Sequence, residues 1–105
     1  MPNSSTGQVA IKYGIKGPSL TITTACAASA NAIGEAKRMI EHNIVDKVLV
    51  GGTESGTTSM TIGAFAQIKA LSKQNNEPQK ACKPFDVNRD GFVTVSYTHL
   101  TLPTR

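Results

Sequence analysis

The chain has 105 residues, enough for one small domain with a modest hydrophobic core. Hydrophobic residues make up 39% of it and charged residues 17%, so the composition excludes an intrinsically disordered chain, and no apolar run approaches the length of a membrane span. The formal charge is +4, but the eleven Lys and Arg residues are scattered and aromatic residues make up only 5%. This pattern argues against nucleic acid and leaves solubility or an acidic protein partner as the role of the charge.

The chain begins with a loop-rich segment, residues 1–18, in which a short helix is predicted over Val9–Tyr13. Residues 19–24, SLTITT, alternate apolar and polar side chains and are rich in β-branched residues, which predicts a strand. From Ala27 the apolar residues recur at helical spacing. This helix is predicted to end near Asn43, a residue type that tolerates a left-handed cap.

Residues 46–52, DKVLVGG, form a short apolar run ended by two glycines and predict a buried strand. Together with residues 19–24 and the intervening helix, they predict a βαβ unit with parallel strands and a right-handed crossover. A second helix is predicted over Ile62–Ser72 and is followed by an exposed polar loop. Residues 82–93, CKPFDVNRDGFV, predict a turn and the start of a further strand.

The segment DVNRDG matches the opening of a calcium-binding loop, with Asp86, Asn88, Asp90 and Gly91 at its first, third, fifth and sixth positions. A complete loop needs a bidentate glutamate at its twelfth position, which here is Tyr97. We therefore expect no metal site. The segment is interpreted as a tight turn held by Asp side-chain hydrogen bonds to the backbone.

The cysteines Cys26 and Cys82 are too few and too far apart in the sequence for a disulfide framework. With no signal peptide visible, they indicate a reducing compartment, and we expect the cytoplasm.

Cys26 lies where the predicted strand gives way to the predicted helix. A nucleophile at such a junction needs small neighbours, because the turn that displays it is sharp, and Ala25, Ala27, Ala28 and Ser29 meet that need. The free N–H groups at a helix start favour a thiolate, and a backbone N–H there could stabilise the oxyanion formed when a thioester is attacked. The alternative is a small buried hydrophobic side chain, which spacing alone does not exclude.

The chain resembles the β-ketoacyl-acyl-carrier-protein synthases, above all the type II condensing enzyme of bacterial fatty-acid synthesis. Four segments carry the resemblance in order and spacing: GIKGPSLTITTACAASANAIGEA, DKVLVGGTES, GAFAQIKALS and KPFDVNRDGFV. The resemblance covers residues 1–93, which are interpreted as a fragment of the family's N-terminal synthase domain. It implies an α/β fold, namely an incomplete part of the layered α/β/α thiolase-like fold that contains the βαβ unit and a nucleophile elbow.

The resemblance also implies an acyltransferase of fatty acid biosynthesis that needs no cofactor. Cys26 matches the catalytic cysteine that takes an acyl group from acyl carrier protein. Malonyl-acyl-carrier protein then loses carbon dioxide, and its carbanion attacks the thioester to give a β-ketoacyl chain two carbons longer. Phe65 and Thr61 match positions that bind the acyl chain, and Lys69 matches a contact with the acidic carrier protein. The family acts as a homodimer, and nucleic acid and membrane are not expected as partners.

The chain departs from the family in two respects. The family's two catalytic histidines and its lysine lie in a second half beyond this chain, and His42 and His99 match neither histidine. We therefore expect this polypeptide by itself to be inactive. Residues 94–105, TVSYTHLTLPTR, replace a glycine-rich, acidic segment of the family. They are interpreted as a foreign tail introduced by cloning, sequencing or assembly.

Three alternatives remain open. The first is a polyketide ketosynthase, which uses the same chemistry on another substrate. The second is a thiolase-type acyltransferase, although degradative thiolases rely on a second cysteine and Cys82 is poorly placed for that role. The third is a βαβ interaction module without catalysis that binds an acidic partner.

Overall fold

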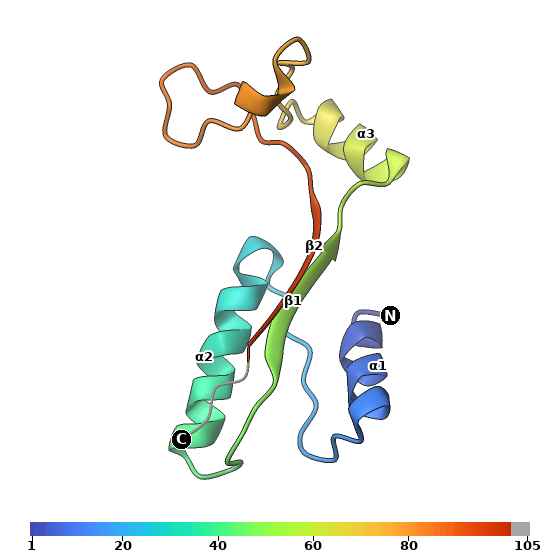
Figure 1. The fold of residues 1–105 in the computed structure, drawn as a ribbon, viewed down its shortest axis with the longest axis vertical. Coiled ribbons are helices and arrows are strands. Elements are labelled where there is room, and N and C mark those ends of the chain that lie inside the picture. Colours follow the sequence, from blue (N-terminus) through green and yellow to red (C-terminus); the bar gives the residue numbers. More distant parts are fainter. Residues whose placement is uncertain (102–105) are drawn as a thin grey trace. The chain divides into compact units, whose positions relative to one another are not determined.

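The computed structural model describes residues 1–101 (Figure 1). The chain divides into two compact units. The N-terminal unit is Met1–Thr53 together with the chain from Thr98 onward, and the central unit is Glu54–Tyr97. The regular elements are α1 (Ser4–Tyr13), α2 (Ala28–Glu41), β1 (Val50–Ser55), α3 (Ser59–Gln67) and β2 (Ser96–Thr101), with 3-10 turns η1 (Ala25–Ala27) and η2 (Pro78–Lys80).

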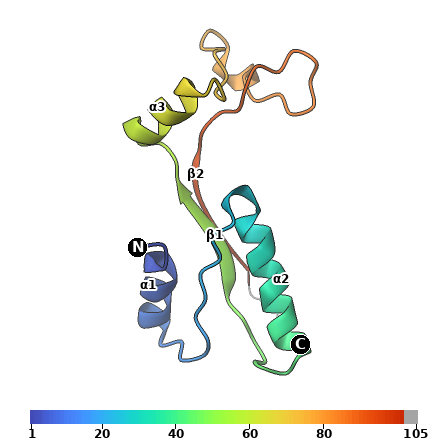
Figure 2. The same ribbon diagram turned by 180° about the vertical axis from the view of Figure 1, so that it is seen from behind.

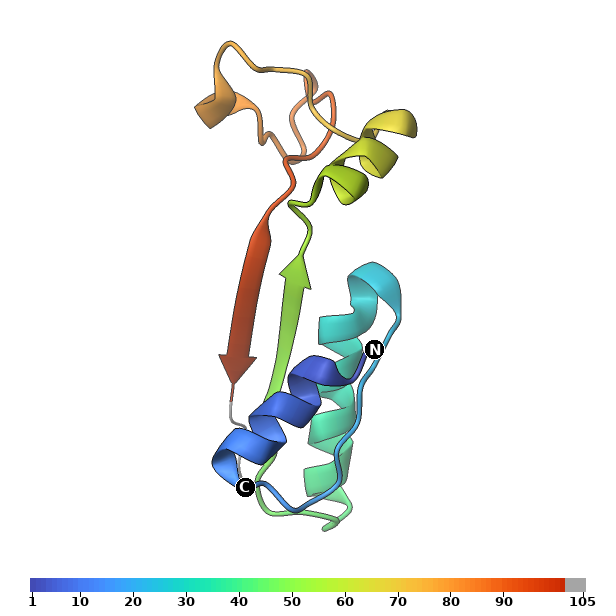
Figure 3. The same ribbon diagram turned by 90° about the vertical axis from the view of Figure 1, so that its right-hand side faces the viewer.

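The described sheet consists of β1 paired with β2. The hydroxyl of Thr94, just before β2, donates to the Gly56 carbonyl at 3.2 Å, and that of Ser96 donates to the Glu54 carbonyl at 3.1 Å. Residue numbers therefore rise along one strand while they fall along the other, as in an antiparallel pair. The arrows of the two strands accordingly point in opposite directions in Figure 3.

The predicted class, a partial α/β fold, is confirmed, but the predicted βαβ unit with parallel strands is wrong. Residues 19–24 form no strand, and β1 pairs with β2 instead. A strand forms only where a neighbouring strand makes hydrogen bonds with its backbone N–H and C=O groups. Residues 19–24 have no such neighbour among the described residues, whereas β1 has one in β2. The segment between α1 and α2 runs as irregular chain (Figure 2), tied to α1 by Thr6 Oγ1 and Thr21 Oγ1, which lie 3.2 Å apart.

All three α-helices end in a left-handed residue. The φ angles are 63° at Gly14, 58° at Asn43 and 57° at Lys69. The left-handed cap predicted at Asn43 is confirmed, while the one at Lys69 was not foreseen because lysine rarely adopts this conformation. Each end is closed by a hydrogen bond from the next N–H to the carbonyl five residues earlier, as in a Schellman motif. These bonds are Ile15 to Ala10 at 2.9 Å, Ile44 to Met39 at 2.9 Å and Ala70 to Phe65 at 3.0 Å.

Two helices have other boundaries than predicted. The helix α1 already begins at Ser4, before the predicted start at Val9. The helix α3 begins at Ser59 because the side chain of Thr58 accepts a hydrogen bond from the Thr61 N–H and so caps it. It ends before Lys69, so the end predicted at Ser72 is wrong.

Within the N-terminal unit, α2 lies close to β1. An added Cβ at Gly52 would meet the hydroxyl of Ser29 on α2 and lie 3.1 Å from the Ser29 Cβ, so the absence of a side chain at Gly52 lets Ser29 lie against β1. The described residues bury four apolar side chains almost fully, namely Ala36, Met39, Val50 and Ala81. No helix among residues 1–101 combines the length and apolar character needed to cross a membrane.

Candidate active site

Cys26 lies in the 3-10 turn that leads directly into α2, and its side chain is exposed. The preceding residue, Ala25, has a φ angle of 50°, in the left-handed region. This conformation costs about 1–2 kcal/mol for a residue with a Cβ and is least hindered when the side chain is small. The alanine before Cys26 is therefore part of a sharp turn, and exposure of the thiol contradicts the alternative of a buried hydrophobic side chain.

Two hydrogen bonds hold Thr24, the residue in front of this turn. The Ala27 N–H donates to the Thr24 carbonyl at 3.2 Å and closes the 3-10 turn. The Asn31 amide, on α2, donates to the Thr24 hydroxyl at 2.7 Å. Sequence reasoning missed this pair, because seven residues separate its members and neither belongs to a chemical motif. The pair ties the segment before Cys26 to the helix after it.

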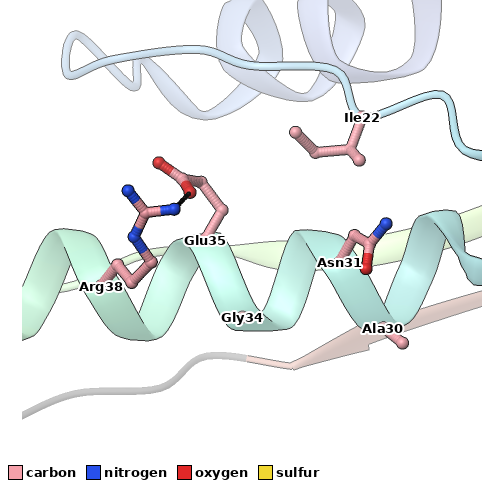
Figure 4. Close-up of a pocket in the computed structure, with 6 residues that line it drawn as sticks. All are labelled: Ile22, Ala30, Asn31, Gly34, Glu35 and Arg38. Carbon is pink, nitrogen blue, oxygen red and sulfur yellow. Dashed lines mark ion pairs between the residues drawn. The ribbon is translucent and has the colours of Figure 1, made fainter.

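A hollow of about 360 Å³ lies along one face of α2, in the N-terminal unit. It is lined by Ile22, Ala30, Asn31, Gly34, Glu35 and Arg38 (Figure 4). An ion pair of 3.2 Å joins Arg38 Nη1 to Glu35 Oε2 at its wall. Cys26 is not among the lining residues, so the thiol is displayed on the surface and not inside this hollow.

The other predicted site residues belong to the central unit, at or near α3. Thr61 helps to form the start of the helix, where its hydroxyl lies 2.8 Å from that of Thr58. Phe65 is half-buried, and its ring packs edge-to-face on Phe92 with the ring centroids 5.0 Å apart. Lys69 is exposed at the left-handed position that ends α3. The structure thus places Thr61 and Phe65 on α3 and Lys69 just after its end, while Cys26 lies in the N-terminal unit.

The carboxylate of Asp90 joins two segments of the central unit. Its Oδ1 accepts hydrogen bonds from Ser72 Oγ at 2.7 Å and from Gln74 Nε2 at 3.1 Å, and its Oδ2 accepts one from the Lys73 N–H at 2.9 Å. These donors, the Ser72 hydroxyl first, hold the pKa of Asp90 below its ordinary value of 3.8. The contact was not predicted, because its partners lie 16 to 18 residues apart.

The predicted tight turn over DVNRDG is confirmed. The Asp86 carboxylate accepts a hydrogen bond from the Asn88 N–H at 2.7 Å, which is the expected side-chain to backbone contact. The carboxylate of Asp90 is instead turned to residues 72–74. Among residues 1–101, no three His, Cys, Asp or Glu side chains gather into a group able to hold a metal ion.

Lowering the pH is expected to destabilise the central unit through Asp90. Because its pKa is lower in the folded chain than in the unfolded one, the stabilisation is present above the unfolded value of about 3.8 and is lost as pH falls through the folded pKa. Urea unfolding at pH 6 and pH 3 measures this loss. The loss should be smaller in Ser72→Ala, which removes the first donor, and in Asp90→Asn. Equal losses in the parent chain and both variants would contradict the assignment.

The family model described as "Beta-ketoacyl synthase, N-terminal domain" matches residues 1–95, so the chain belongs to this family. The resemblance to the β-ketoacyl-acyl-carrier-protein synthases predicted from the sequence is thereby confirmed. The chain is 50% identical over 91 residues to 3-oxoacyl-[acyl-carrier-protein] synthase 2 of Coxiella burnetii (strain RSA 493 / Nine Mile phase I). It is 46% identical over 92 residues to the mitochondrial 3-oxoacyl-[acyl-carrier-protein] synthase of Arabidopsis thaliana.

These alignments cover 87% of this chain but 22% and 20% of the two relatives, so the chain spans about a fifth of their length. Among solved structures, a chain of the AntDE:AntF complex is similar with a TM-score of 0.91 and 34% identity over 97% of this chain and 26% of that one. That complex is a type II PKS acyl-carrier protein with its ketosynthase bound to the hexaketide. A beta-ketoacyl synthase from Burkholderia phymatum STM815 has a TM-score of 0.90 at 29% identity, over 97% of this chain and 25% of that chain. Both neighbours support the predicted thiolase-like class.

Proposed function

We propose that this chain supplies the nucleophile-bearing part of a 3-oxoacyl-acyl-carrier-protein synthase, an acyltransferase that elongates fatty acids. The observation that carries the proposal is an exposed Cys26 on a tight turn at the start of α2, within a chain whose residues 1–95 match the synthase family. The curated relatives named above are 3-oxoacyl-acyl-carrier-protein synthases, which supports the same reaction.

In the proposed reaction, the Cys26 thiolate attacks the thioester carbonyl of an acyl-acyl-carrier protein. The backbone N–H of Cys26 stabilises the oxyanion, the carrier protein leaves as its thiolate, and the acyl group stays on Cys26 as a thioester. Malonyl-acyl-carrier protein then loses carbon dioxide, and its carbanion attacks that thioester. The products are a β-ketoacyl chain longer by two carbons and the regenerated Cys26 thiolate. These steps require no cofactor.

The central unit contributes substrate and partner contacts in this proposal. Phe65 and Thr61 line the acyl chain, and the Phe92 ring supports Phe65 from the side. The exposed cation of Lys69 meets the acidic acyl carrier protein. A structural neighbour is found in complex with an acyl-carrier protein, which supports such a partner. A homodimer in the cytoplasm belongs to the same proposal.

We further propose that residues 94–105 are not native to the domain. The family match ends at residue 95, two residues into this segment, which supports a boundary close by. Against it stands β2, which lies in the segment and pairs with β1. Reading the genomic DNA downstream of the codon for Val93 tests it. A continuous reading frame that encodes residues 94–105 in the source genome would contradict the proposal.

The function is tested in a chimera, in which the matching segment of this chain replaces the 91 aligned residues of the Coxiella burnetii relative. This chimera is incubated with an acyl-acyl-carrier protein and then digested with a protease. The masses of the peptides are measured by mass spectrometry. We expect the acyl mass on the peptide that contains Cys26, and release of β-ketoacyl product when malonyl-acyl-carrier protein is added. A folded chimera with no acyl mass on Cys26, or with equal labelling of Cys82, would contradict the proposal.

A polyketide ketosynthase is the second candidate, because the similar AntDE:AntF chain belongs to a type II PKS assembly. The identity of 34% to that chain is lower than the 50% to the fatty-acid relative, which favours fatty acids. The two candidate functions differ in their products, because a polyketide ketosynthase condenses repeatedly without reduction of the keto groups. Accumulation of poly-β-keto chains by the chimera would favour the second candidate.

A further inference from the structure

We propose that Asn31 is a positioning residue, which holds the Cys26 turn in place through the hydroxyl of Thr24. The inference rests on the proposed function only in naming Cys26 as the nucleophile. The contact itself is a hydrogen bond of 2.7 Å from Asn31 Nδ2 to Thr24 Oγ1, short for a bond between neutral groups.

The turn needs an external hold because its backbone is strained. Between Thr24 and Cys26 lies Ala25 with a φ angle of 50°, a conformation that persists in a residue with a Cβ only when its surroundings impose it. The Ala27 N–H fixes the Thr24 carbonyl at 3.2 Å, and Asn31 fixes the side chain of the same residue. The backbone and the side chain of Thr24, on the N-terminal side of the strained residue, are thereby both tied to the residues that begin α2.

The helix can act as an anchor because it is itself fixed. Ala36 and Met39 are buried on α2, and Ser29 touches the backbone of β1 at Gly52. The N-cap residue Ala27 provides no side-chain hydrogen bond, so the start of α2 lacks the usual link to the preceding chain. The side chain of Asn31 supplies such a link from about one turn further along.

Loss of the bond allows Ala25 to relax to a negative φ angle and moves the Cys26 sulfur away from the helix start. The turn displays the Cys26 side chain at the surface, so a change in the turn changes how the sulfur meets a reagent. The reactivity of Cys26 should therefore fall, while the overall fold and the exposed Cys82 in the central unit stay as they are. This selective loss distinguishes positioning from a general contribution to stability.

The test is alkylation of the chimera by iodoacetamide, with the rates at Cys26 and Cys82 read from their separate peptides. In Asn31→Ala, in Thr24→Val and in the double variant, we expect the ratio of the Cys26 rate to the Cys82 rate to fall about fivefold, as for loss of one ordinary hydrogen bond. The double variant should fall no further than either single variant, because both remove the same bond. Thr24→Ser keeps the hydroxyl and should restore the ratio of the parent.

An unchanged ratio, or losses that multiply in the double variant, would overturn the proposal. A rise in the Cys82 rate with a changed circular dichroism spectrum would overturn it too, since that result marks general unfolding. Alkylation needs no acyl carrier protein, so the proposed function and the positioning role of Asn31 can be refuted independently of each other. A reduced ratio in a chimera that never becomes acylated refutes the proposed function and leaves the positioning role standing.

Discussion

Replacing Gly91 with alanine is expected to unfold the central unit under conditions in which the parent chain keeps it. The φ angle of Gly91 is 148°, a backbone conformation that residues with a Cβ rarely adopt. An added Cβ would press on backbone atoms of Leu71 and Ser72 and would lie 2.7 Å from the Ala70 carbonyl oxygen. Because these are backbone atoms, no side-chain rotation relieves the contact.

The segments that would be forced apart are joined by several bonds. The Ser72 N–H donates to the Phe92 carbonyl at 3.0 Å and the Phe92 N–H donates to the Ala70 carbonyl at 2.9 Å. Beside them, Asp90 accepts the three hydrogen bonds from residues 72–74. Losing this junction should lower the free energy of unfolding by about 2–4 kcal/mol, the range for backbone strain combined with broken hydrogen bonds.

The matched control is Gly63→Ala, in α3 of the same unit. Nothing lies within 4 Å of the Cβ that it adds. Alanine inside a helix is more stable than glycine by about 1 kcal/mol, so this variant should raise the free energy of unfolding. Urea denaturation of the chimera and its two variants measures both effects. Equal stability of Gly91→Ala and the parent would show that the junction is looser than its contacts imply.

The features predicted correctly from the sequence depend on residues close together in the chain. The helix α2 follows from its apolar spacing, and its end follows from Asn43, whose left-handed conformation is closed by the residues of the last turn. The turn at Cys26 was inferred from its small neighbours and from its place directly before the predicted helix. In each case the partner groups lie within about one or two helical turns, so the local pattern contains the needed information.

The features that were missed depend on partners far along the chain. Residues 19–24 have the composition of a strand, but strand formation requires a neighbouring strand. The composition of a segment does not show which other segment pairs with it. The end of α3 was placed too late because Leu71, which fits the helical pattern, instead pairs with Phe92 in a parallel bridge. The Asp90 contacts likewise join segments that no periodicity connects.

The same dependence explains the exposed apolar side chains. Ile11 on α1 is 79% exposed and Ile68 beyond α3 is 69% exposed, although both are apolar residues within segments predicted as helices. A helical pattern in the sequence therefore does not identify what covers such side chains. Because exposed apolar surface promotes association, we expect the isolated polypeptide to aggregate through such side chains.

Cys26→Ser is expected to lower the condensation rate of the chimera by on the order of a thousandfold or more, since the attacking atom is replaced. A serine hydroxyl matches the thiol in shape, but it is a weaker nucleophile than a thiol at neutral pH and attacks thioesters poorly. The exposed position of Cys26 means that neither this change nor Cys26→Ala should alter folding. Both variants should therefore keep the circular dichroism spectrum of the parent while losing acylation and product.

The matched control is Cys82→Ser, which removes the chain's other exposed thiol. Cys82 follows η2 in the central unit, at a position without a helix start after it, and its loss should leave the rate of product formation unchanged. Product is counted as β-ketoacyl-carrier protein released per chimera in a single turnover and at steady state. If Cys26→Ser retained the parent rate, or if Cys82→Ser lost it, the nucleophile would lie elsewhere, because a thiol that performs the first bond-forming step cannot be replaced without loss of that step.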